Sequence, residues 1–395
     1  MTARNTALAL SALSLSLLAA QAQAADSLTQ ALTEADLKLN FRYRLEAVDQ
    51  DGKPEDALAS TLRSRITVQT GDWQGLSALA EVDNVSLIGN DSYNSTANGK
   101  ADYPVVADPK GTDLNQAALK YSWAKDGSVT VGRQRINHND QRFLGGVGWR
   151  QNEQTYDGYR LQTALVDGLH LDYSYLHNVN RIFGPDGAKA DLHGAIQALN
   201  LTYSAGNHSL ALFGYDLDFD TAAALSSRTL GLRYQGKADR LSWVLSYARQ
   251  SDSGDNSADY DADYWLAELN WALGAVTLGV GYELLGSDNG QAFATPLATL
   301  HKFQGFADQF LATPATGIQD AYVKASGSLA GGNWLLAIHD FSADVGGADY
   351  GQELDAQFAY PVNKHVKVLA KYAHYNADDL ATDTDKLWLM AVASF

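Results

Sequence analysis

The sequence predicts an all-β fold, a transmembrane antiparallel up-and-down β-barrel of about 18 strands. Three observations lead to this class. Apolar and polar residues alternate over many segments, the connections between segments alternate between short and long, and the chain begins with an export signal. A period of two places successive side chains on opposite faces of a strand. An apolar face backed by a basic face suits a wall between lipid and water.

The clearest strand covers residues 37–46, which read Leu-Lys-Leu-Asn-Phe-Arg-Tyr-Arg-Leu-Glu. One parity is apolar or aromatic, and the other carries Lys38, Arg42 and Arg44. The segment at 61–69 repeats the pattern with Arg63 and Arg65. A soluble β-sandwich is the alternative, but its aromatic residues would be scattered along the strands. Here Trp and Tyr gather near strand ends, as in the aromatic belts of membrane proteins.

The connections support the same architecture. Short links such as 71–75 and 166–168 are rich in Gly, Asn, Asp or Pro and close hairpins. The links between them, such as 84–113 and 286–317, are longer and polar. Short periplasmic turns and long extracellular loops are typical of outer-membrane barrels. With no linker in the sequence, we expect one barrel domain at 25–395 that starts with a short periplasmic lead at 25–35.

The N-terminus predicts export. Arg4 precedes an apolar segment at 7–20, and Ala22-Gln23-Ala24 resembles a cleavage site, so residues 1–24 are expected to be a cleaved signal peptide. A transmembrane anchor is less consistent with the sequence, because the apolar segment is short and no basic stop follows. The chain has no Cys and so no disulfide framework. We expect the bacterial outer membrane as its location.

The C-terminal segment 387–395 alternates and ends in Phe395. It resembles the strand by which the outer-membrane assembly machinery recognises its substrates. The expected partners are this machinery, the lipid bilayer, lipopolysaccharide, and anionic small molecules or saccharides. A net charge of −17 argues against nucleic acid as a partner.

In a channel, selection depends on charged side chains that face the lumen. Parity gives the following inward candidates: Arg42, Arg44, Arg63, Arg65, Lys120, Arg160, Glu81 and Asp83. Arg133 and Arg135 share a parity with apolar Val131, so they require a bulge near Gly132 or a position above the membrane. Guanidinium groups favour the passage of acidic solutes. The alternative is that arginines and carboxylates form a lattice that only stiffens the wall.

Two loop segments are unusually apolar, 142–150 and 303–311. The first carries Arg142 and Arg150, and the second supplies the candidate constriction residues Phe303, Phe306, Asp308 and Phe310. Such segments would not remain in solvent. They either pack on one another at the rim or fold inward and narrow the channel. In the second case, deletion of 303–311 should raise the conductance.

The sequence lacks His-Glu-x-x-His, Gly-x-Ser-x-Gly and a Walker-type loop, so we expect no enzyme, no catalytic residue and no cofactor. A barrel phospholipase would need Ser and His close together on the lipid-facing wall. His177 is outward by parity, but a lone His is more often a satisfied polar group. The acidic segment 251–263 lacks the spacing of a Ca²⁺-binding loop. We therefore expect a solvated rim there rather than a metal site.

Three segments, 59–65, 132–157 and 301–314 continuing to Tyr322, resemble the alginate-export family of outer-membrane porins. The resemblance implies an arginine-lined constriction through which an anionic polyuronate passes. The matching positions are Arg42, Arg44, Arg63, Arg65, Arg133, Arg135, Arg142, Arg150 and Arg160. Nearby Glu81 and Asp83 imply a less basic lumen than in an alginate exporter.

The expected function is therefore passive diffusion of anionic solutes, such as alginate or other uronate-type saccharides. The alternative is a barrel-anchored receptor or adhesin that binds partners through its extracellular loops.

Overall fold

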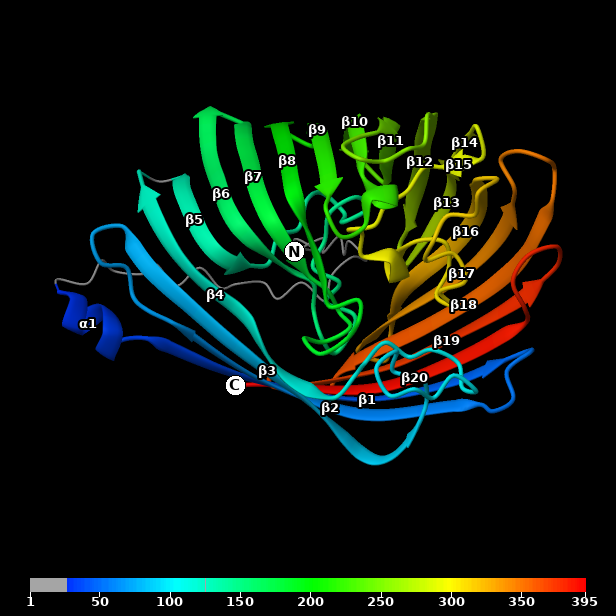
Figure 1. The fold of residues 1–395 in the computed structure, drawn as a ribbon, viewed down its shortest axis with the longest axis horizontal. Coiled ribbons are helices and arrows are strands. Elements are labelled where there is room, and N and C mark those ends of the chain that lie inside the picture. Colours follow the sequence, from blue (N-terminus) through cyan, green and yellow to red (C-terminus); the bar gives the residue numbers. More distant parts are fainter. Residues whose placement is uncertain (1–26, 125) are drawn as a thin grey trace.

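The computed structural model describes residues 27–124 and 126–395, and within them 18 strands form one closed antiparallel barrel (Figure 1). Each strand pairs with its neighbours in the chain, and β1 also pairs with β20, which closes the wall. The predicted fold class is confirmed. The predicted signal peptide at 1–24 lies outside the described residues.

The barrel strands are β1 (Asp36–Gln50), β2 (Ala57–Gln69), β3 (Leu76–Ser92), β4 (Gly111–Trp123), β5 (Gly127–Gln134), β6 (Thr155–Val166), β7 (Leu169–Asn180), β8 (Asp191–Ala205), β9 (His208–Phe219), β10 (Ser227–Ala238), β11 (Leu241–Asp252), β12 (Asp261–Leu273), β13 (Val276–Leu285), β16 (Ile318–Leu329), β17 (Gly332–Ser342), β18 (Asp349–Pro361), β19 (Val366–Ala377) and β20 (Thr384–Ser394). A separate hairpin contains β14 (Ser287–Asp288) and β15 (Gln291–Ala292). The helical segments are α1 (Leu28–Thr33), η1 (Ala223–Leu225) and η2 (Leu300–Lys302).

The two faces of the wall differ as the alternation predicts. On β1, Phe41 and Tyr43 are each 37% exposed on the outer face, whereas Arg42 and Arg44 are 5% and 1% exposed on the inner face. Large apolar side chains are likewise exposed on strands throughout the barrel. An apolar outer wall is what a strand needs to contact lipid.

Helices of the kind that span membranes do not occur in the part of the chain that the structure describes.

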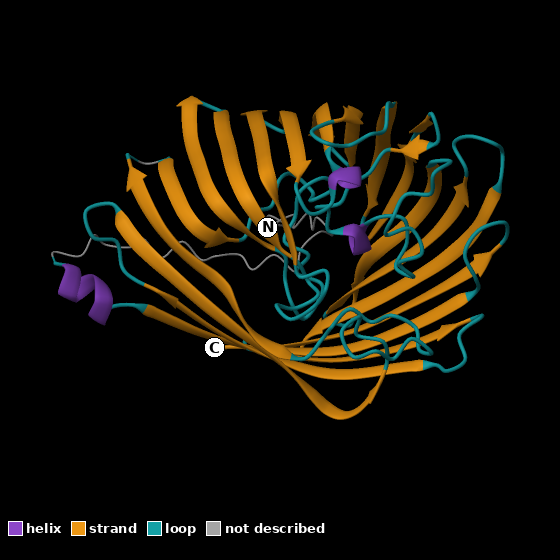
Figure 2. Cartoon of the chain, viewed as in Figure 1, coloured by secondary structure: helices purple, strands orange, loops and turns teal. Residues whose placement is uncertain are grey.

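Loop segments enter the barrel (Figure 2), and two of them share one hydrophobic cluster. We call residues 135–154, between β5 and β6, the first inner loop, and residues 286–317, between β13 and β16, the second inner loop. Leu144 of the first and Leu297 of the second are fully buried in one hydrophobic cluster, which also includes inward side chains of the wall such as Phe213, Tyr264 and Phe341. The hydrophobic core therefore lies inside the barrel, between the loops and the wall.

Candidate channel constriction

The two inner loops are joined to each other by backbone and side-chain hydrogen bonds. Gly145 donates its N–H to the Leu297 carbonyl at 2.9 Å, and Thr299 donates its N–H to the Gln141 carbonyl at 3.0 Å. The Thr299 hydroxyl also donates to Oε1 of Gln141 at 2.7 Å. The apolar segments expected at the rim or in the lumen thus pack on one another and do so inside the barrel.

Arg42 and Arg44 hold the backbone of the first inner loop. Arg42 donates to the Gly148 carbonyl at 2.8 Å, to the Arg150 carbonyl, and to Oε1 of Gln151 at 2.9 Å. Arg44 donates to the Trp149 carbonyl at 2.6 Å. Carbonyl groups of an irregular buried segment need partners, and a planar guanidinium supplies several in fixed geometry. These two arginines are used to dock the loop.

Asp308 links both loops to the wall. It accepts from Arg150 at 3.1 Å, from His301 Nδ1 at 2.7 Å and from Lys386 of β20 at 3.2 Å. Burial disfavours its charge, but His301, Lys386 and Arg150 outweigh this and hold the pKa of Asp308 well below its usual range. Arg150 also reaches Glu46 of β1 at 3.1 Å.

Trp149 lies between cationic and aromatic groups. Its ring stacks on His301 at 4.2 Å between centroids, and the Arg44 guanidinium lies 4.3 Å from the ring centroid. Lys371 of β19 is 4.5 Å from the same ring and 3.0 Å from the centroid of Phe306. Cation–π contacts of this kind strengthen when the groups are shielded from water.

Glu153, at the end of the first inner loop, lies within ion-pair distance of three arginines. Arg65 donates to it at 2.9 Å, Arg135 at 2.6 Å, and Arg63 lies 3.8 Å away. Burial alone would raise the pKa of Glu153, but Arg135, Arg65 and Arg63 hold it well below its usual range. Arg65 also makes a bidentate pair with Asp83, with both contacts at 2.6 Å. Glu81, the other predicted acid, lies 3.0 Å from Arg135.

The second inner loop contacts the remaining walls. Phe303 lies against Arg142 of the first inner loop, with the guanidinium 4.6 Å from its ring centroid, and Arg142 in turn donates to Glu283 of β13 at 2.8 Å. The N–H of Phe306 donates to Asp355 of β18 at 3.1 Å. Phe310 packs on Phe341 of β17, with 4.7 Å between ring centroids. Each of the four candidate constriction residues therefore has a fixed contact inside the barrel.

Arg133 does not belong to the lumen group. Its register partners are Ala117 and Asp157, with no register shift at Gly132, so it lies on the same face as exposed Val131. It makes a bidentate pair with Asp157 of β6 at 2.8 and 3.0 Å, and donates to the Leu114 carbonyl of β4 at 3.0 Å. β5 ends at Gln134, one residue after Arg133, so the Arg133 side chain links β6 to β4 at the end of the strand between them. Arg135 follows the strand end and turns inward to Glu153.

The arginines that were predicted to line the lumen differ in the exposed fraction of their side chains. Arg42, Arg44, Arg63, Arg65, Arg142 and Arg150 are at most 8% exposed. By contrast, the Arg135 side chain is 30% exposed and Arg160, paired with Asp172 at 2.9 Å, is 15% exposed. Lys120 is exposed and has no ion-pair partner in the part of the chain described. The strand arginines mainly anchor the inner loops, and the open cations lie elsewhere on the wall.

Sequence reasoning did not single out Glu153, Gln151 or His301. Parity does not apply to irregular loops, so these side chains had no assigned direction. A signal was present, because the basic apolar segment 142–150 is followed directly by polar residues and Glu153. Buried arginines need acceptors, and the nearest acid in the chain was a candidate.

A family model described as alginate export matches residues 33–289. The chain belongs to the alginate export family. Among solved structures, it is similar to Pseudomonas aeruginosa OccK9 (OpdG), with 15% identity, a TM-score of 0.74, and coverage of 92% of this chain and 99% of that chain. Acinetobacter baumannii OccAB4 gives 15% identity and a TM-score of 0.72, over 92% and 98% of the two chains. Pseudomonas aeruginosa OpdO gives 15% and 0.70, over 93% and 98%.

A comparison with curated proteins gave no match. The likeness to these solved structures shows that the chain has the fold of outer-membrane porins. With the family, they make it an outer-membrane channel of the porin type.

Proposed function

We propose that this chain is an outer-membrane channel for passive diffusion of small anionic solutes, with uronate-type saccharides among them. The observation that carries the proposal is the set of lumen-facing cations without a carboxylate partner. Lys120 on β4 and Lys367 on β19 are exposed and form no ion pair with any described residue. The buried arginines, by contrast, are largely neutralised. Unpaired cations at the water-filled wall attract anions.

The comparisons support the same class of solute. The family is described as alginate export, and alginate is a polyuronate. A structure of Pseudomonas aeruginosa OpdK, similar to this chain with a TM-score of 0.69 and 13% identity, was determined with vanillate, which is a carboxylate. The two inner loops pack on one another and on the wall inside the barrel, and a narrowed lumen favours small solutes over a thick polymer.

The test is the reversal potential in planar bilayers under a salt gradient. We expect a preference for anions that falls when Lys120→Gln and Lys367→Gln are combined. Arg249→Gln is the matched control, because the Arg249 side chain is 54% exposed and paired with Asp261 near the outer strand ends. A cation preference in the unaltered protein would refute the proposal.

A second function remains, a barrel-anchored receptor that binds partners through its outer loops. The observation that favours it is the extent of the hydrophobic cluster between the inner loops and the wall. A barrel that conducts no ions in the same bilayer experiment would support the receptor.

A further inference from the structure

A hollow of about 520 Å³ lies between the long-loop ends of β3 and β4. Its polar side chains are Asn84 and Ser86 of β3, Thr112 of β4, and Lys110, which directly precedes β4. Pockets of roughly 300–1,000 Å³ are the usual size for small-molecule ligands. The hollow is therefore large enough for the headgroup of one lipid.

The hollow opens on the lipid-facing side of the wall. Asn84 and Ser86 share the parity of Val82 and Ile88, which are 40% and 45% exposed on the outer face. Leu87, also in the lining, points to the other face and packs against a small buried cluster from β1, β2 and the loop after β3. The hollow is thus closed on the lumen side and open on the membrane side.

β3 loses its neighbouring strand at this place. The ladder between β3 and β4 ends at the pair of Val85 and Gly111, but β3 continues beyond it (Figure 1). Backbone groups along an open strand edge are costly in hydrocarbon, so this edge belongs at the level of the lipid headgroups. The register agrees, because Ser86 lies in one row of the sheet with Leu62 and Tyr43. Exposed tyrosines near the long-loop ends mark the membrane interface.

The polar side chains of the hollow are joined to one another and can still bind a ligand. Asn84 donates from Nδ2 to Oγ1 of Thr112 at 2.7 Å, and the Ser86 hydroxyl donates to Oδ1 of Asn84 at 2.7 Å. Among the described residues, none accepts the Thr112 hydroxyl hydrogen and none donates to the Ser86 oxygen. One donor and one acceptor therefore remain for a hydroxylated ligand.

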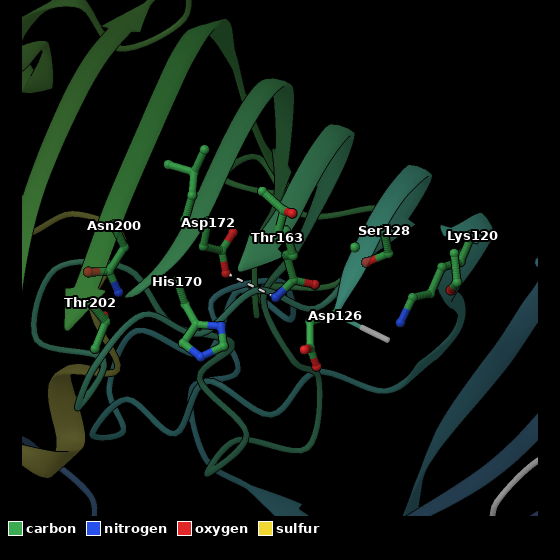
Figure 3. Close-up of a pocket in the computed structure, with 12 residues that line it drawn as sticks. Lys120, Asp126, Ser128, Thr163, His170, Asp172, Asn200 and Thr202 are labelled. Atoms are coloured by element: carbon green, nitrogen blue, oxygen red, sulfur yellow. Dashed lines mark hydrogen bonds between the residues drawn. The ribbon is translucent and has the colours of Figure 1, made fainter. Parts of the chain in front are cut away.

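The positive charge of the hollow is not neutralised. Asp91 of β3 lies close enough to interact with Lys110, but it is paired with Lys100 at 2.5 Å. Lys110 itself is exposed, forms no ion pair with a described residue, and is the one charged group among the described residues of the lining. The hollow on the inner wall in Figure 3 differs, because Lys120 shares that lining with Asp126. The outer hollow is therefore complementary to an anion.

We propose that this hollow binds the phosphorylated sugar headgroup of a lipopolysaccharide molecule in the outer leaflet. Lys110 holds a phosphate group, and the hydroxyls of Ser86 and Thr112 bind the sugar. The acyl chains lie along Val82 and Leu114, which are register partners on the outer face and are 40% and 45% exposed. A bound headgroup also supplies polar partners for the open edge of β3. The site concerns the lipid side of the wall and does not depend on which solute passes through the lumen.

The experiment is native mass spectrometry of the purified protein in detergent, titrated with bisphosphorylated lipid A. Lys110→Gln should weaken the binding of one lipid A molecule about tenfold, the loss of one charge-assisted contact. Lys110→Arg should retain most of the affinity, and Thr112→Val should lower it by a smaller factor. Lys53→Gln is the matched control, because it removes an exposed lysine of another outer loop that does not line the hollow.

Two comparison ligands define the class: dephosphorylated lipid A keeps the acyl chains and sugars, and inorganic phosphate keeps the charge. Weaker binding of both than of lipid A supports the proposal. Equal binding of dephosphorylated lipid A, or equal affinity in Lys110→Gln and Lys53→Gln, overturns it. Phosphate that binds as tightly as lipid A makes the site one for the free ion and also overturns it. Heat-modifiable electrophoretic mobility shows that each variant is a folded barrel.

Discussion

Arg142 of the first inner loop donates from Nε to Oε1 of Glu283 on β13 at 2.8 Å, and both side chains are buried. Arg42 and Arg44 on β1 hold the far end of the same loop through the carbonyls of Gly148 and Trp149. β1 and β13 are not neighbours in the barrel, so the loop is fastened to two separate parts of the wall. The loop is therefore held at both sides of the lumen and not at one side alone.

Replacing Arg142 by Met should loosen this crossing. Glu283 would be left as an uncompensated buried carboxylate, which typically costs about 3–5 kcal/mol. We expect a higher and noisier single-channel conductance, and a lower midpoint of chemical unfolding. The control is Arg228→Met, which breaks an exposed pair with Asp216 and should cost less than about 1 kcal/mol. Equal conductance in the two variants would mean that the Arg142 contact does not hold the loop.

Arg133 and Arg135 are two residues apart, but their replacement by Gln should have different effects, one on stability and the other on ion selectivity. Arg133→Gln removes the tie between β4 and β6, so we expect lower resistance to chemical unfolding with an unchanged reversal potential. Arg135→Gln removes a cation that is 30% exposed in the lumen, so we expect a weaker anion preference. Unfolding curves and reversal potentials of both variants check this. A shift in selectivity by Arg133→Gln alone would place Arg133 in the lumen after all.

The alternation of apolar and polar residues predicted the strands and their two faces, because successive side chains of a strand point to opposite sides of the sheet. Tyr43 and Ile66 are exposed on the outer face, so their strand neighbours Arg42 and Arg65 must point inward, and Arg63 shares the parity of Arg65. Parity could not show that a loop covers these arginines, because that depends on contacts between residues about a hundred positions apart, such as Arg42 with Gln151. It also could not settle Arg133, whose role depends on where β5 ends. The sequence therefore predicts direction, but not which inward charges remain open to water.

Replacing 303–311 by a short Gly-Ser linker should raise the conductance. This segment buries Phe310 against Phe341 and covers Lys371 with Phe306. Its removal would open the lumen beside β17 to β19 and expose the cation of Lys371. We expect a larger single-channel conductance and a stronger anion preference. The control is an equivalent replacement of 253–257 in the outer loop between β11 and β12, which should leave both quantities unchanged.

Acid should release the inner loops through His301. Burial, helped by Lys371 and Arg150 and opposed by Asp308, lowers the pKa of His301 from 6.5 to about 3. The ring is therefore neutral in the folded protein, with Nδ1 donating to Asp308 at 2.7 Å and Nε2 accepting from Lys371 at 2.6 Å. The unfolded or undocked loop binds a proton more readily than the docked loop does. The stabilisation is complete above about pH 6.5 and is lost progressively as the pH falls towards 3.

Protonation would place a positive ring against the Lys371 ammonium, which disfavours the docked loop. We expect the conductance of the unaltered channel to rise between pH 6.5 and 4. His301→Gln keeps one donor and one acceptor but cannot titrate, so it should flatten that rise. His177→Gln, at an exposed position on β7, should leave the profile unchanged. Identical profiles for His301→Gln and the unaltered protein would exclude His301 as the titrating group, because glutamine cannot take up a proton in its place.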